Sequence, residues 1–127
     1  MKLEEIRRQY RGDSVQTATP LDLVVLLGER ALLDLDRAAR AEAGGDLAKT
    51  REQLAHARAV VLELLASLDR ERGGELVENL ARLYVFAVTR LVLPARGEGV
   101  KAAREVLAAI VDGFRLVRRG AADGAAR

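Results

Sequence analysis

Side chains that could perform catalysis are few in this sequence, and their spacing joins none of them into a site. The chain has one histidine, His56, two serines, Ser14 and Ser67, and no cysteine. The lack of cysteine excludes a thiol nucleophile, a thiolate metal site and a disulfide. A serine nucleophile needs a base within hydrogen-bond reach, and the local sequence brings no histidine to either serine. We therefore predict that the protein is not an enzyme.

The residues around His56 argue against phosphotransfer and metal binding. Phosphotransfer domains built as helical bundles usually present their histidine in a His-x-x-Lys-Gly type of context, whereas Ala57, Arg58 and Ala59 follow His56. The chain also has no paired Glu-x-x-His set for a carboxylate metal site. We predict that His56 is a solvated side chain on a polar helix face, and we expect no metal and no cofactor. A sensor or phosphotransfer module is the least favoured alternative.

Charge and hydropathy argue against two classes of partner. The 21 basic and 19 acidic residues are interleaved, and only 3% of the residues are aromatic, so a stacking surface for nucleic acid is missing. No apolar run approaches the roughly 18 residues that a membrane span needs. The N-terminus does not have the positive-then-apolar layout of a signal peptide. We expect no nucleic-acid partner and no membrane insertion.

Proline, glycine and capping residues divide the chain into four helical segments. Thr19-Pro20-Leu21-Asp22 combines a capping threonine, a proline at the first helical position and an acid three residues after the cap. Gly44-Gly45, Gly73-Gly74 and Pro94 are predicted to end the helices that precede them. The predicted helices cover residues 20–43, 46–70, 75–93 and 100–119.

Four helices with short connections predict an all-α fold, an antiparallel up-down four-helix bundle. Half of the 127 residues are apolar, which is enough for one domain with a buried core. We predict that residues 1–19 form an N-terminal cap segment, residues 20–119 the bundle, and residues 120–127 a disordered tail.

The first helix carries more apolar surface than one packed face requires. Six of the seven residues from Leu21 to Leu27 are apolar, whereas a helix packed on one side needs a stripe little wider than about 100°. Leu26 and Leu33 then fall on the otherwise charged side, and a line of alanines with Leu62 lies roughly 90° from the core seam of the second helix. These features favour a shallow groove for another helix, although alanine is also a good surface helix former. The third and fourth helices show inward seams, which include Leu76, Leu80, Leu83, Val100, Ala103, Leu107, Ile110, Phe114 and Val117.

The order and spacing of these signals resemble the flagellar secretion chaperone family, FliS. Tyr10 and Ser14-Val15-x-Thr17-Ala18-Thr19-Pro20, followed by the leucine-rich helix, match the opening of the family pattern. Gly73-Gly74-Glu75-Leu76, Asn79-Leu80 and Leu83-Tyr84 match its third helix, and the resemblance covers about residues 7–118. The family's usual Leu-Tyr-Asp-Gly is Leu27-Gly28-Glu29-Arg30 here, and Phe114 stands at the usual tryptophan of the last helix.

The resemblance implies a cytoplasmic export chaperone that binds the disordered C-terminal segment of flagellin. Binding would prevent premature polymerisation and keep flagellin competent for flagellar type III secretion, with one client per chaperone and a monomer or weak dimer as the free state. A segment that folds on binding needs a large apolar contact, because ordering it costs roughly 2–5 kcal/mol. The alternative is a structural helical bundle that self-associates through the same apolar stripes and has no flagellin client.

We predict that the first three helices line the client groove. The candidate anchors are Leu23, Leu26, Leu33, Ala55, Ala59, Leu62, Val85 and Phe86. The resemblance also implies that residues 1–19 fold over part of this groove and move aside for flagellin, with Ile6, Tyr10 and Val15 as the apolar contacts. A locally packed N-terminal arm without a gating role fits the sequence equally well.

Overall fold

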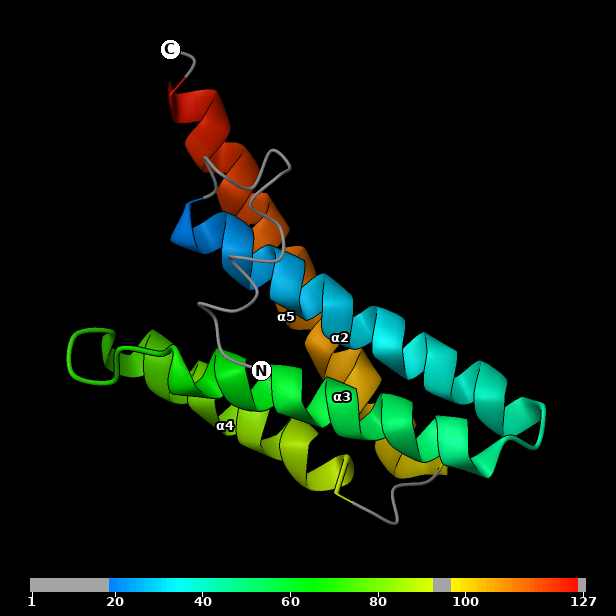
Figure 1. The fold of residues 1–127 in the computed structure, drawn as a ribbon. Coiled ribbons are helices and arrows are strands. Elements are labelled where there is room, and N and C mark those ends of the chain that lie inside the picture. The colour runs from blue at the N-terminus through cyan, green and yellow to red at the C-terminus, as the bar shows by residue number, and fades with distance from the viewer. Residues whose placement is uncertain (1–18, 93–96, 126–127) are drawn as a thin grey trace.

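The computed structural model describes residues 19–92 and 97–125, and all regular secondary structure in these ranges is helical. The helices in chain order are α2 (Pro20–Ala43), α3 (Leu47–Ala66), α4 (Gly74–Arg90) and α5 (Gly97–Ala125). The chain reverses direction between successive helices (Figure 1). The predicted all-α, four-helix fold is confirmed. The predicted cap contacts Ile6, Tyr10 and Val15 lie outside the described residues.

A capping box fixes the start of α2, as the sequence predicts. Oγ1 of Thr19 accepts a hydrogen bond from the backbone N–H of Asp22 (3.1 Å), and the carboxylate of Asp22 accepts one from the N–H of Thr19 (3.0 Å). Both N–H groups belong to the helix start, where no helical carbonyl can reach them. The hydrogen bond from the Thr19 backbone also holds the pKa of Asp22 below its ordinary value.

The end of α3 comes earlier than the sequence predicts. The helix ends at Ala66 rather than near Arg70. Oδ1 of Asp69 accepts hydrogen bonds from the backbone N–H groups of Glu71 and Arg72, both at 3.2 Å. Aspartate favours such turns over helix continuation, because its short side chain competes for the backbone donors.

The last two helices also differ from their predicted ends. α4 ends at Arg90 instead of Leu93, and the next N–H, that of Leu91, turns back to the carbonyl of Val88 (3.0 Å). α5 continues to Ala125, beyond the predicted end at Arg119 and into the expected tail. Ala121 and Ala122 are strong helix formers, and the helix continues through them although Gly120 weakens it.

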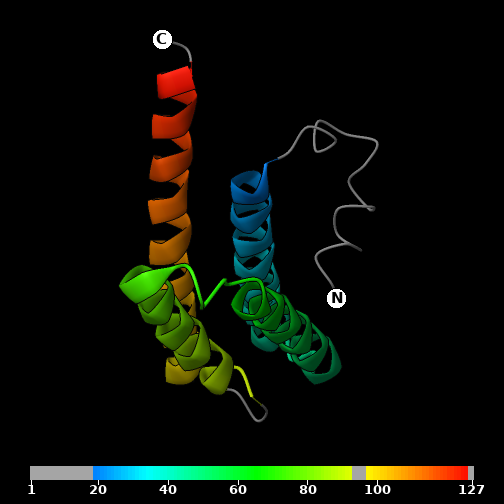
Figure 2. The same cartoon turned by 90° about the vertical axis from the view of Figure 1, so that its left-hand side faces the viewer.

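The helices form two layers. α2 and α5 lie side by side in one layer, and α3 and α4 form the other (Figures 1 and 2). The layers are closest near the α2–α3 turn and diverge toward the start of α2, where α5 extends past α3 and α4 (Figure 1). This divergence decides which apolar side chains the bundle covers.

Ion pairs join α2 to α5 along their shared side. Nε of Arg104 lies 2.8 Å from Oδ1 of Asp36, and Nη2 of Arg115 lies 2.8 Å from Oε2 of Glu29. The hydrogen bond from Arg104 holds the pKa of Asp36 below its ordinary value. Pairs this exposed contribute at most about 1 kcal/mol each, so their main effect is to fix how α5 sits along α2.

Tyr84 lies in the core and gives the fold a testable response to alkali. Its side chain is 1% exposed, and burial raises the pKa of Tyr84 to about 12 from 10.0. The unfolded chain therefore releases this proton at a lower pH than the folded chain, so the free energy of unfolding falls as the pH rises from 10 to 12. At about 1.4 kcal/mol per pKa unit, the loss is about 3 kcal/mol.

We expect Tyr84→Phe to remove this part of the alkaline destabilisation, because phenylalanine has no proton to release. The measurement is urea unfolding of both proteins at about pH 9 and about pH 12. If the wild type and Tyr84→Phe lose the same stability over this range, the buried phenol is not responsible.

Candidate functional site: an apolar groove between α4 and α5

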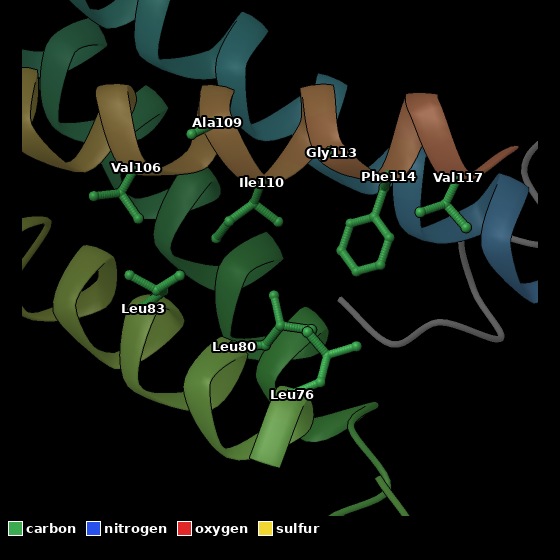
Figure 3. Close-up of a pocket in the computed structure, with 9 residues that line it drawn as sticks. All are labelled: Leu76, Leu80, Leu83, Val106, Ala109, Ile110, Gly113, Phe114 and Val117. Atoms are coloured by element: carbon green, nitrogen blue, oxygen red, sulfur yellow. The ribbon is translucent and has the colours of Figure 1, made fainter. Parts of the chain in front are cut away.

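An open groove of about 450 Å³ lies between α4 and α5. In Figure 3, Ile110 and Phe114 point from α5 toward Leu80 and Leu76 of α4. Every lining residue is apolar: Leu76, Leu80, Leu83, Val106, Ala109, Ile110, Gly113, Phe114 and Val117. With no titratable or nucleophilic side chain in its walls, the groove can bind a ligand but cannot react with one.

The rim of this groove exposes large apolar side chains to solvent. Leu76 is 70% exposed, Val117 59% and Leu83 41%, while Ile110 at the base is 9% exposed. Single exposed leucines are common on protein surfaces, but a contiguous apolar patch with a hollow marks an interaction site. The groove is therefore the candidate functional site.

The length of the groove matches a short helix. Its lining on α5 runs from Val106 to Val117, about 16 Å at 1.5 Å per residue, which equals three helical turns. An amphipathic helix would fill it with apolar side chains at positions i, i+3 or i+4, and i+7. Ala109 and Gly113 have small side chains or none, so the backbone of a ligand can approach α5 closely at these positions.

The sequence predicted these residues but assigned them to the core. Leu76 and Val117 belong to the seams that we expected to point inward, yet both are exposed. The helices do carry these apolar seams. The part of each seam toward the start of α4 and the end of α5 stays exposed, because the two helical layers diverge there. Gly113 offered a signal, since a glycine inside a helix weakens it by about 1 kcal/mol relative to alanine. A Cβ at Gly113 would meet no atom within 4 Å, so packing in this chain does not require the glycine.

The eight predicted anchors do not line the groove between α4 and α5. Leu23 is 1% exposed and belongs to the interior of the protein. Leu33 and Leu62 are exposed on α2 and α3, and three other anchors on these helices are half-buried: Leu26, Ala55 and Ala59. The predicted groove on α2 and α3 thus remains a prediction, separate from the groove between α4 and α5.

Val85 and Phe86 face different directions on α4. Consecutive helical residues are about 100° apart, so the two side chains cannot share one wall. Phe86 stands three residues after Leu83 of the groove, and the guanidinium carbon of Arg90 lies 3.7 Å from the centre of its ring. Phe86 therefore lies beneath a cation and is not among the residues that line the groove, and Val85 is exposed.

His56 is not the solvated surface side chain that the sequence predicted. Its Nδ1 contacts Oδ2 of Asp34, whose side chain is fully buried. Nε of Arg30 lies 3.3 Å from Oδ1 of the same carboxylate, and the His56 side chain is only 29% exposed. A buried carboxylate needs partners, so the contact between His56 and Asp34 is a polar cross-link between α3 and α2, while Arg30 approaches the same carboxylate from within α2. Packing therefore accounts for this histidine.

Other chemistry is also missing from the part of the chain that the structure describes. In residues 19–92 and 97–125, no three side chains of the metal-ligating types come together. Among the described helices, none is long and apolar enough to cross a membrane. The hydroxyl of Ser67 donates to the carbonyl of Leu64 (2.7 Å) at the end of α3.

Comparison with known proteins places these features among flagellar proteins. The family described as flagellar protein FliS matches residues 3–120. The flagellar secretion chaperone FliS of Salmonella typhimurium is 33% identical over 94 residues, which cover 73% of this chain and 70% of the relative. The flagellar secretion chaperone FliSB of Pseudomonas aeruginosa is 34% identical over 89 residues, covering 67% and 71% respectively. The family match takes in α2, α3, α4 and most of α5.

Proposed function

The chain belongs to the FliS family of flagellar proteins, and we propose that it is a flagellar secretion chaperone whose α4–α5 groove holds an amphipathic helix of its client. Secretion chaperones are binding proteins, in agreement with the prediction that this chain is not an enzyme. The proposed client is flagellin, through its disordered C-terminal segment, with one client per chaperone in the cytoplasm.

The observation that carries this proposal is the exposed, wholly apolar groove. Ordering a disordered segment costs roughly 2–5 kcal/mol, which the apolar contact must exceed. Full burial of a leucine or valine side chain contributes about 1.5–3 kcal/mol. Leu76, Leu83 and Val117 are exposed in the free chain, so covering them offsets the ordering cost before any other contact forms.

Occupation of the groove also accounts for the chaperone effect. In this proposal, the terminal segments of flagellin are amphipathic, and subunits polymerise through their apolar faces. A client helix whose apolar face lies against Leu80, Ile110 and Phe114 cannot present that face to another flagellin. The bound segment is thereby kept from premature polymerisation until export.

The experiment that tests the function is isothermal titration of the full chain with the C-terminal segment of flagellin from the same organism. We expect saturable one-to-one binding and a large negative heat-capacity change, because apolar burial has that signature. No detectable binding at tens of micromolar would contradict the proposal. A mass that rises with protein concentration would then support the self-associating structural bundle.

We expect the double variant Leu76→Asp with Val117→Asp to bind the client at least about thirty-fold more weakly, equivalent to about 2 kcal/mol. Each carboxylate would have to lose its hydration against the apolar face of the client. Both positions are exposed, so helix content measured by circular dichroism should not change. The readout is the same titration.

Two further double variants make this result specific. Leu47→Asp with Val92→Asp changes the same residue types at similarly exposed positions outside the groove, and it should bind normally. Leu26→Asp with Leu62→Asp tests the surface on α2 and α3. If that pair abolishes binding while the Leu76 and Val117 pair does not, the client helix lies on α2 and α3 instead.

A further inference from the structure

Gly28 lies on the face of α2 that packs against α5. It stands in the middle of α2 and is buried. A Cβ built on Gly28 would lie 2.5 Å from Cγ2 of Val111 on α5, whereas carbon atoms make optimal contact at about 3.5–4.0 Å. A glycine inside a helix is unfavourable relative to alanine, so its position here needs a reason. The reason is steric, because Val111 occupies the space that a side chain would fill.

Val111 connects this contact to the groove. It follows Ile110 and precedes Phe114 by three residues, and both neighbours line the groove. The ion pairs of Arg115 with Glu29 and of Arg104 with Asp36 hold α5 against α2 on both sides of Val111. Ile110 and Phe114 belong to the same helix as Val111. The distance between Val111 and the backbone of α2 therefore also sets the position of Ile110 and Phe114.

We propose that Gly28 is a positioning residue of the client groove. Because Gly28 has no side chain, Val111 can pack directly against the backbone of α2, and this contact sets the position of α5 relative to α4. This inference rests on the proposed function of the groove. A side chain at position 28 would displace α5 by about 1 Å, the shortfall from an ordinary carbon contact. Rotation of the Val111 side chain would relieve this clash only at a cost, because valine in a helix has one strongly preferred χ1 rotamer.

The test compares the wild type with Gly28→Ala, Val111→Ala and the double variant. Each is made with cysteines at Arg82 and Asp112, which are exposed on α4 and α5, and the native chain has no cysteine to interfere. Spin labels on these cysteines report the separation of the two helices. Titration of each unlabelled variant with the C-terminal segment of flagellin reports affinity, and circular dichroism reports folding.

We expect Gly28→Ala to shift the label separation by about 1–2 Å, following the contact shortfall, and to weaken client binding about ten-fold. Adding Val111→Ala removes both γ-methyl groups, so the double variant should regain the wild-type separation and bind within about twofold of the wild type. A glycine with only a local structural role would change stability and leave affinity and separation alone.

The two readouts separate failure of this inference from failure of the proposed function. If the wild type does not bind flagellin, the proposed function fails, and the label separation still tests whether Gly28 positions α5. If the wild type binds and Gly28→Ala changes neither separation nor affinity, the positioning role is overturned. It is also overturned if Gly28→Ala weakens binding and Val111→Ala does not restore it.

Discussion

Replacing Gly113 with tryptophan is expected to abolish client binding while the bundle stays folded. An added Cβ at this position meets no atom within 4 Å, so the backbone of α5 can carry a side chain here. The indole would instead occupy the space between α4 and α5 that we assign to the client helix. We expect affinity to fall at least about a hundred-fold, equivalent to about 2.8 kcal/mol.

The Gly113→Trp variant carries its own reporter. The native chain has no tryptophan, so fluorescence comes from the introduced indole alone, and blue-shifted emission would show that it lies in the apolar groove. Gly113→Ala is one control and should bind normally, because a methyl group leaves the groove open. Ala43→Trp, at an exposed site at the end of α2, is the other. Normal affinity together with blue-shifted emission would show that the client binds elsewhere.

His56→Ala is expected to destabilise the folded chain by about 3 kcal/mol, because it removes a hydrogen-bond partner from a fully buried carboxylate. The variant leaves the carboxylate of Asp34 fully buried, with Arg30 as its remaining partner. Asp34→Leu is expected to cost no more than about 1 kcal/mol. His56 is 29% exposed and Arg30 38% exposed, so both can turn to water once the carboxylate is gone.

Urea unfolding of the two single variants and of the double variant measures this asymmetry. The double variant should resemble Asp34→Leu, because His56 has no buried carboxylate to contact once Asp34 is replaced. Equal losses in the two single variants would contradict the assignment of Asp34 as the buried member of the pair. The cross-link joins α2 to α3 and lies outside the groove, so client affinity of the folded fraction should not change.

The helical segments were predictable because the signals that start and stop helices act over a few residues. The threonine cap, the first-turn proline and the glycine pair at its end predicted α2 as residues 20–43, the range that the structure shows. α3 begins after Asp46, whose carboxylate accepts a hydrogen bond from the N–H of Lys49 (3.0 Å). Such caps depend on neighbours three or four residues away, which are fixed by the sequence alone.

Helix ends were less predictable where no strong stop signal, such as a glycine pair or a proline, directly follows the helix. α3 ends at Ala66, before a turn in which Asp69 accepts backbone hydrogen bonds, and α5 runs past Arg119 even though Gly120 follows it. The family could also be recognised from the sequence, because its pattern consists of helix caps, prolines and glycine pairs in a fixed order. The family match over residues 3–120 covers the residues that carry these signals.

The groove and the interior contacts are decided by tertiary structure. Sequence periodicity gives each helix an apolar seam, but the angle between layers determines how much of that seam another helix covers. Leu76 and Val117 are therefore exposed, although their spacing is that of core residues. The pairing of Asp34 with His56 and the contact of Gly28 with Val111 join helices that only the fold brings together. Local hydrogen bonding sets the helices, whereas burial depends on neighbours that are distant in the chain.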